Sequence, residues 1–303
     1  MNSRSVDVVI PCYNGEAFLY PCVESVVNQT YKVSKIILID DGSTDKSLDV
    51  MCDLARKYSN VKVVTQPNMG LSSARNAGIR NSESELVAFL DADDYWLASK
   101  LENQIRLLDN FDGKQPIAIA SNYKLLKSET LLPGIRNPKA RLINLRNLLL
   151  FRVVIPGSGS SVLLSRSIID ACGFFDEKLS YGEDLDYWVR VSKLFSWRIS
   201  EECDVVIYNN LEGIQSKARK DPQLLLDGSR KLLLKYSSEL KALDLILINS
   251  YIETLAHRIA SKGPARGPLI KSKVKVHVRL IGNAYALFIK LDRKNSAYRF
   301  GRD

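Results

Sequence analysis

The sequence has little histidine and no ordered arrangement of cysteine, and this excludes several kinds of site. Only two of the 303 residues are His, and the five Cys are scattered, with neither a CxxC pair nor a neighbouring His. The pattern lacks zinc-ligand spacing and the even number of a disulfide framework, so we expect buried thiols in a reducing compartment. No apolar run approaches the roughly 20 residues that span a bilayer, and the first residues show no secretory signal. We therefore expect a cytoplasmic globular protein.

Most of the chain lacks an excess of positive charge. The excess is concentrated in the last 42 residues. Eleven Lys or Arg face two acidic residues between Lys262 and Asp303, a difference of nine that equals the formal net charge of the whole chain. This segment could be a solvated helical surface, a nucleic-acid patch or an anionic-membrane patch. Its mixture of basic, apolar and aromatic residues favours peripheral attachment to the inner face of the plasma membrane. No nucleic-acid motif accompanies the charge, so we expect no nucleic-acid partner.

The first hundred residues alternate short apolar strand patterns with helical patterns. Such an order predicts an α/β fold with a Rossmann-like, doubly wound, mostly parallel sheet flanked by helices. Ser43 or Thr44 is a candidate N-cap for the second helix. Further along, "VIPGSGSSVLLSR" indicates a Gly/Ser-rich turn and a strand, Glu183 and Asp184 open a helical stripe, and the pattern is mostly helical from about Asp221. The predicted strands are Val6–Pro11, Lys35–Asp40, Val61–Gln66 and Glu85–Asp91.

Polar residues follow the predicted strands where each one ends. In open parallel sheets, ligands bind outside these carboxyl ends. The sequence "FLDADDYW" brings Asp91, Asp93 and Asp94 together directly after an apolar run. In extended geometry Asp91 and Asp93 would point to the same side, because they are two residues apart. Paired carboxylates suit Mg²⁺ or Mn²⁺, which would complete its shell with phosphate oxygens and water.

Five segments in order and spacing resemble family 2 glycosyltransferases with the GT-A fold. The resemblance covers roughly residues 5–215 and implies a glycosyltransferase domain over 1–215, followed by a helical extension over 216–303 that is basic from about 262. Processive relatives carry a QxxRW-type signature and transmembrane helices, and neither is present. The five segments are "VVIPCYNGEAFLYPCVESVVNQTY", "IILIDDGSTDKS", "NMGLSSARNAGI", "FLDADDYW" and "GEDLDYWVR".

The resemblance assigns the donor side of the site. Asp41 would hydrogen-bond a uracil or equivalent base, Tyr13 would stack beside that base, and Pro11 would contribute backbone contact. Arg75 would be the cation near the acids and the donor sugar, and Asp91 would grip the ribose or sugar. The implied donor is a nucleotide-diphosphate sugar, with a UDP-sugar favoured.

The resemblance also implies the metal and the catalytic acids. Asp91 and Asp93 would form a DxD motif on Mn²⁺ or Mg²⁺, with Asp94 sharing ligation. Glu183 and Asp184 match an acidic pair in which the aspartate deprotonates the acceptor hydroxyl, so that the anomeric configuration inverts. The acceptor would be a glycan or a polyprenyl-linked sugar in bacterial surface polysaccharide biosynthesis.

One departure leaves rival functions open. The family often has a His after the strand that follows the acidic pair, and here Leu211 takes that position. Metal ligation would then be weaker or completed by water and phosphate. A catalytically inactive nucleotide-binding scaffold is one alternative. A sugar nucleotidyltransferase is another, although "PCYNGEAF" after the first strand lacks the Gly-rich, cationic phosphate loop expected of it.

Overall fold

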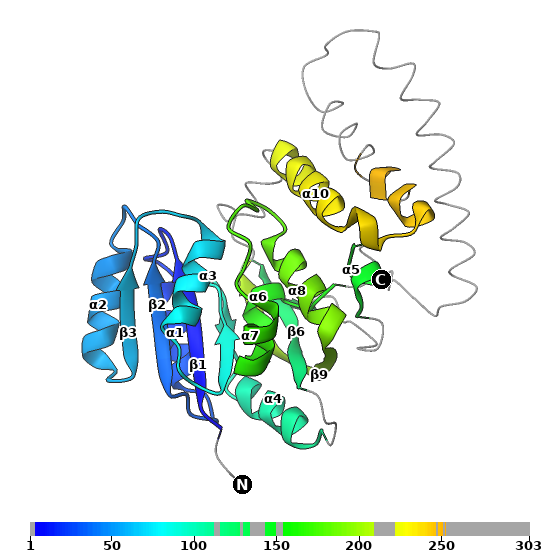
Figure 1. Cartoon of the computed structure of the whole chain (residues 1–303). Coiled ribbons are helices and arrows are strands. Elements are labelled where there is room, and N and C mark those ends of the chain that lie inside the picture. Colours follow the sequence, from blue (N-terminus) through cyan, green and yellow to red (C-terminus); the bar gives the residue numbers. More distant parts are fainter. Residues whose placement is uncertain are drawn as a thin grey trace. The chain divides into compact units, whose positions relative to one another are not determined.

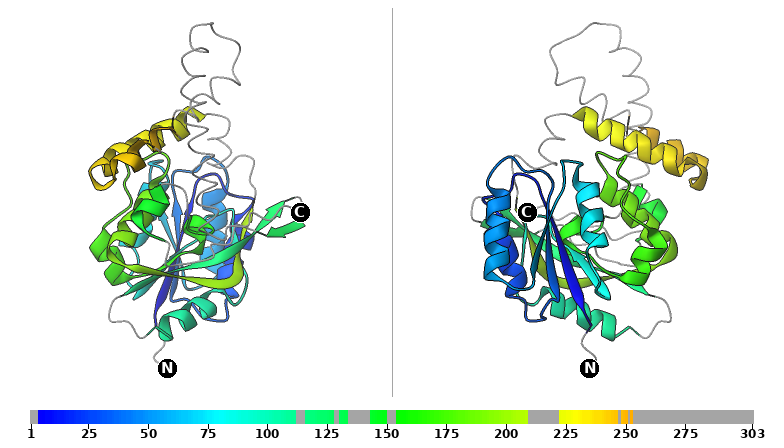
Figure 2. Two further views of the ribbon diagram at one scale, coloured as in Figure 1. Left: turned by 90° about the vertical axis from the view of Figure 1, so that its right-hand side faces the viewer. Right: turned by 60° about the vertical axis from the view of Figure 1, so that its left-hand side comes forward.

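A computed structural model describes residues 4–111, 116–127, 130–133, 143–149, 154–208, 222–246, 248–250 and 252. The chain divides into two compact units, residues 1–216 and 217–303, and each is described by itself. Unit 1 contains a mixed sheet with the strand order β3-β2-β1-β4-β8-β6-β9-β5, and β7 pairs with β6. Figure 2 shows helices on either side of these strands.

The first half of the sheet is parallel and is built from the β-α repeats that the sequence predicts. β2 and β4 both pair with β1, and β3 pairs with β2. Figure 1 shows these strands together, with α2 beside β3. The strands are β1 (Val6–Cys12), β2 (Lys35–Asp40), β3 (Val61–Thr65) and β4 (Leu86–Phe89). The helices between them are α1 (Leu19–Val27), α2 (Ser47–Lys57) and α3 (Leu71–Arg80).

The second half of the sheet begins where β8 pairs with β4 in the antiparallel direction. β6 then pairs with β9 in parallel, and β9 with β5 antiparallel. The strands are β5 (Tyr95–Trp96), β6 (Ile117–Lys127), β7 (Thr130–Pro133), β8 (Leu163–Ser165) and β9 (Ser196–Tyr208). The helices are α4 (Lys100–Asp109), α5 (Leu145–Leu149), α6 (Ser158–Ser161), α7 (Arg166–Cys172) and α8 (Glu183–Leu194).

β1, β2 and β4 are buried on both faces. Successive side chains of a strand point to opposite sides of the sheet, and here each side is covered. Val8 and Ile10 of β1 join a core cluster that also contains residues of α1, α2 and α4. Ile37 and Ile39 of β2 point the other way and pack with Ala74 of α3. Burial on both faces explains why these strands read as continuous apolar runs.

The predicted α/β fold class is confirmed, and the predicted N-cap of α2 is wrong. Neither Ser43 nor Thr44 caps α2, which begins at Ser47 with Lys46 in the N-cap position and no side-chain cap. The Gly/Ser-rich turn predicted before β8 is present at Pro156 and Gly157, and a short helix, α6, follows it before the predicted strand. The assignment of functional domains to 1–215 and 216–303 stays a prediction.

Unit 2 is helical where the structure describes it. It contains α10 (Pro222–Tyr236) followed by a 3₁₀ turn (Ser237–Glu239). Among the described residues, no helix combines the length and apolar character needed to cross a bilayer. The basic segment Lys262–Asp303 lies outside the described residues, so its predicted membrane attachment is not tested.

Candidate active site

The parallel register places the ends of β1, β2 and β4 along one edge of the sheet. Cys12 lies opposite Asp40, and Phe89, the last residue of β4, lies opposite Val9. Pro11 is buried inside β1, opposite Ile39, whereas Tyr13 just beyond the strand is 44% exposed. The edge therefore gathers the predicted donor-side residues, and Tyr13 presents its ring to solvent.

The loops after β1 and β2 are joined by hydrogen bonds between side chains and backbone. The amide of Asn14, at φ +55°, donates to Ser43 Oγ over 3.0 Å, and Asn14 Oδ1 accepts the Thr44 amide at 2.8 Å. The Gly15 amide donates to Ser47 Oγ over 2.8 Å. Ser43 and Thr44 therefore connect two loops rather than capping α2.

Asp41 follows β2 and is held by the loop that precedes α3. It is 3% exposed. Its Oδ1 accepts hydrogen bonds from Gln66 Nε2 at 2.7 Å and the Met69 amide at 2.9 Å, and its Oδ2 accepts the Gly70 amide at 2.9 Å. A carboxylate has about four acceptor positions, so one remains for a ligand donor.

The acids after β4 lie in a turn, so the extended geometry expected for Asp91 and Asp93 is wrong. The amide of Asp94 donates to the carbonyl of Asp91 over 3.0 Å, as in a β-turn. The side chain of Asp91 is 31% exposed, and Asp93 is half-buried.

Asp94 differs from its two neighbours because its carboxyl group faces the interior. One oxygen accepts Ser160 Oγ at 2.5 Å, and the other accepts the Tyr208 amide at 3.0 Å. Burial, together with the charges of Asp91 and Asp93, raises the pKa of Asp94 well above its ordinary value. The group joins β4, the segment before β8 and the end of β9, and its predicted share in metal ligation stays a prediction.

Arg75 of α3 is a buried cation that connects the acids of two distant segments. It is 2% exposed, and it donates to Asp91 at 2.8 Å and to Glu183 at 3.2 Å. Its Cζ lies 5.4 Å from the centre of the Phe175 ring. Burial opposes the charged form, but the two acids outweigh it and raise the pKa of Arg75.

Glu183 and Asp184 occupy the first turn of α8, as predicted. Negative charge is favoured there by the helix dipole. Nevertheless, burial and the charge of Asp184 raise the pKa of Glu183 to about 7, against the opposing effect of Arg75. Asp184 accepts a hydrogen bond from Ser158 Oγ and, at 2.6 Å, from the amide of Leu185. The two acids therefore have different partners, a cation for Glu183 and neutral donors for Asp184.

The segment Gly157–Ser161 belongs to this site, although the sequence indicated only a turn. Ser158 contacts Asp184, while Ser160 Oγ accepts the Asp91 amide at 3.1 Å. At Gly159, a Cβ atom would lie 2.7 Å from Arg75 Nη2, so glycine leaves room for the guanidinium. The small residues of "GSGSS" could have indicated a site segment, because small residues allow the backbone to approach buried charged groups closely.

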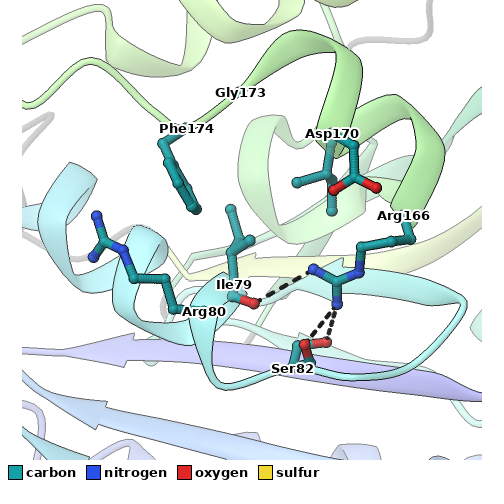
Figure 3. A pocket seen from close by; sticks show the side chains of 8 residues that line it. Ile79, Arg80, Ser82, Arg166, Asp170, Gly173 and Phe174 are labelled. Carbon is teal, nitrogen blue, oxygen red and sulfur yellow. Dashed lines mark hydrogen bonds between the residues drawn. The ribbon is translucent and has the colours of Figure 1, made fainter.

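A separate cavity of about 450 Å³ lies at the other end of α3 (Figure 3). None of the predicted site residues lines it. Arg166 donates to the carbonyls of Ile79 and Ser82 there, which fixes α7 against the end of α3. The cavity is lined by Ile79, Arg80, Ser82, Arg166, Ile169, Asp170, Gly173 and Phe174.

Comparison with known proteins determines the family of this chain. Residues 7–170, more than half of the chain, match the family model described as glycosyl transferase family 2. The chain belongs to glycosyltransferase family 2. An uncharacterised glycosyltransferase of Rickettsia typhi is 33% identical over 202 residues, which are 64% of this chain and 61% of that relative. The chain thus spans less than two thirds of that relative's length.

Solved structures of glycosyltransferases share the fold. TarS from S. aureus, residues 1–349 in complex with UDP-GlcNAc, matches with a TM-score of 0.59 at 18% identity, over 98% of this chain and 94% of that chain. GalNAc-T7 with UDP, GalNAc and Mn²⁺ matches with a TM-score of 0.55 at 19% identity, over 70% of this chain and 44% of that chain. The fold of this family 2 member is therefore GT-A.

Proposed function

We propose that this chain transfers a sugar from a UDP-sugar to a hydroxyl group of an acceptor, with inversion at the anomeric carbon. The observation that carries the proposal is Arg75, which joins Asp91 on the donor side to Glu183 beside Asp184. The residue that binds the donor, Asp91, and the acid beside the proposed base, Glu183, would thus be paired with the same buried cation. The complexes of TarS with UDP-GlcNAc and of GalNAc-T7 with UDP support the choice of base.

In the proposed reaction, Asp184 accepts the proton of the acceptor hydroxyl. The acceptor oxygen forms a bond to the anomeric carbon as the bond from that carbon to the diphosphate oxygen breaks, and the electron pair leaves with UDP. Asp184 suits the role better than Glu183, because Glu183 is 13% exposed and paired with Arg75. Positive charge on Arg75 would stabilise the departing diphosphate through electrostatics that need no rearrangement.

The residues at the end of β4 fit a divalent cation. Among the described residues, no group of three or more His, Cys, Asp or Glu is placed to hold a metal ion. Mg²⁺, however, is usually held by one or two carboxylates together with substrate phosphates and water. Asp91 and Asp93 would supply these carboxylates, and the bound ion would neutralise charge on the diphosphate. GalNAc-T7 is a GT-A relative determined with Mn²⁺.

A thermal-shift panel tests the nucleotide and metal together. Nucleoside diphosphates with and without Mn²⁺ or Mg²⁺ would be added to the wild type and to Asp93→Ala. A ligand that binds only the folded state raises Tm by mass action. We expect UDP with metal to raise Tm of the wild type and to lose that effect in the variant. If no nucleotide shifts Tm at saturation, the inactive-scaffold alternative is favoured.

The reaction itself is tested by UDP release from UDP-sugars. Asp184→Asn should lower turnover by roughly 10²- to 10⁴-fold, the usual range for a lost general base, while UDP binding persists. Unchanged turnover in this variant would remove Asp184 from the role. Pyrophosphate production instead of UDP would indicate a nucleotidyltransferase.

For the acceptor we propose a glycan or polyprenyl-linked sugar used in bacterial surface polysaccharide assembly. Support comes from the sequence alone, through the basic and apolar mixture of Lys262–Asp303. Such a segment would hold the enzyme at an anionic membrane surface, where a lipid-linked acceptor is found. Deleting it should abolish flotation with anionic liposomes, and flotation that survives the deletion would contradict this part of the proposal.

A further inference from the structure

Ser158 has a backbone conformation that L-residues other than glycine seldom adopt. Its φ is +43°, and among the described residues only Asn14 shares a positive φ without being glycine. Asn is enriched in this region, whereas Ser must be held there by its surroundings. Gly157 before it has φ +65°. Such conformations persist where the structure over-determines them, and they gather at functional sites.

The backbone on both sides of Ser158 is fixed by hydrogen bonds. Its amide donates to the carbonyl of Ile155 over 3.2 Å, and its carbonyl accepts Ser161 Oγ at 3.1 Å. The amide of Val162 donates to the carbonyl of Gly159 over 3.2 Å, which closes the short helix. This geometry directs the Ser158 hydroxyl to Asp184 Oδ2.

Two donors consequently fix the carboxylate of Asp184. The Leu185 amide holds Oδ1 and the Ser158 hydroxyl holds Oδ2. Arg75, the buried cation, donates instead to Asp91 and Glu183. Without Ser158, the side chain of Asp184 would keep only the hydrogen bond from its own neighbour in sequence, which restricts its torsion angles far less.

We propose that Ser158 is a positioning residue for the acceptor-activating carboxylate, an inference that rests on the proposed function. Its hydroxyl holds Asp184 in the orientation in which the other lone pairs of the carboxylate face the acceptor. Ser158 keeps its own proton throughout, and the acceptor proton moves to Asp184. The strained backbone is what brings the hydroxyl to that place.

Three variants separate the hydroxyl from the backbone. Ser158→Ala removes the hydroxyl and keeps a Cβ atom, so its backbone cost at φ +43° is that of serine. Ser158→Gly removes the hydroxyl and also adopts positive φ freely. Ser158→Asn tolerates positive φ and carries an amide that can donate to Asp184. Ser167→Ala, on the exposed surface of α7, is the matched control.

The measurements are UDP release from a panel of UDP-hexoses and UDP-N-acetylhexosamines, and Tm. We expect kcat of the Ala and Gly variants to fall by roughly tenfold or more, the rate equivalent of one hydrogen bond to a charged group, with KM for the donor unchanged. The Asn variant should recover part of kcat, and Ser167→Ala should match the wild type. Tm should be higher for the Gly variant than for the Ala variant.

The outcomes distinguish this inference from the proposed function. Wild-type kcat in Ser158→Ala overturns the positioning role while glycosyl transfer stands. A fall in kcat that follows Tm across the three variants would assign Ser158 a purely structural role and also overturn it. Absence of UDP release from every donor in the wild type overturns the proposed function and this inference with it.

Discussion

Asp41 and Asp91 follow the two strands that flank β1, yet their charges are compensated in different ways. Asp41 is 3% exposed and accepts three hydrogen bonds from neutral donors of one nearby loop. Asp91 is 31% exposed and is paired with Arg75, a cation that it shares with Glu183. The acid after β2 is held by the loop between β3 and α3, whereas the acid after β4 is held by a cation from within α3.

This difference between the ends of β2 and β4 suggests different ligands for the two places. At the end of β2, neutral N–H donors hold the carboxyl group of Asp41 in one orientation. At the end of β4, Arg75 is paired with both Asp91 and Glu183, and burial together with the charge of neighbouring acids raises the pKa of Asp94 and of Glu183. In the proposed function, Asp41 would be the fixed acceptor for the base, and the carboxylates for the metal ion would come from the end of β4.

The largest effect should come from removing the shared cation. Arg75→Met leaves Asp91 and Glu183 without their partner, and breaking a buried ion pair on one side lowers the free energy of unfolding by about 3 kcal/mol or more. Urea denaturation measures this change. UDP release should fall at least 10²-fold, because donor and acceptor acids would no longer share a counter-charge.

Arg80→Met is the control for that variant. Arg80 lies on the same helix, but its side chain is 52% exposed and its ion pair with Glu177 is long, at 3.8 Å. Exposed ion pairs contribute about 0–1 kcal/mol. If Arg75→Met lowers the free energy of unfolding no more than Arg80→Met does, the described contrast between the ends of β2 and β4 is wrong.

An intermediate effect should follow Asp41→Asn. An amide has one oxygen, so it cannot serve the Met69 and Gly70 amides and Gln66 as the carboxylate does, and an NH₂ group would face an N–H donor. We expect the free energy of unfolding to fall by about 1–2 kcal/mol and UDP binding to weaken. Asp49→Asn on the exposed face of α2 should cost less than about 0.5 kcal/mol. Equal urea midpoints for the two variants would show that the loop hydrogen bonds contribute little.

The smallest effect concerns the pH dependence of stability. The pKa of Glu183 is raised from 4.5 to about 7, so the folded protein binds this proton more tightly than the unfolded chain. Its contribution to stability therefore falls as pH rises from about 4.5 to about 7. Glu183→Gln cannot ionise, so its Tm relative to the wild type should increase across this range, by roughly 2–4 °C for each kcal/mol.

The control for this measurement is Glu201→Gln on the exposed surface of β9. Its Tm difference from the wild type should stay constant with pH. A Tm difference for Glu183→Gln that stays flat or declines between pH 5 and 8 would contradict the raised pKa.

The sequence predicted well those parts of the fold that depend on local periodicity. Strands buried on both faces read as apolar runs, and β1, β2 and β4 lie where those runs are. Glu183 begins its predicted helix at the predicted residue. The residues that follow β1, β2 and β4 were also predicted to lie along one edge, because parallel strands end at the same edge. Their binding roles stay predictions.

Contacts between distant segments could not be predicted in this way. Arg75 was expected near Asp91, but its second partner is Glu183, 108 residues further along the chain. The inward orientation of Asp94 depends on hydrogen bonds from Ser160 and from the Tyr208 amide. Both partners are distant in sequence, so the segment "DADD" does not predict them. Ser158 could not be predicted as a site residue, because Gly/Ser-rich stretches are typical of ordinary turns.

The reversal of strand direction between β4 and β8 has a consequence for how the chain tolerates change in length. Since β8 runs against β4, the chain enters β8 at the edge where it leaves β4, and Leu86 is fixed opposite Ser165. The approach of Ser160 to Asp91 is therefore set by strand pairing. Two residues, Ser161 and Val162, separate Ser160 from β8, so a residue inserted or deleted there would move the Ser160 hydroxyl away from the Asp91 amide.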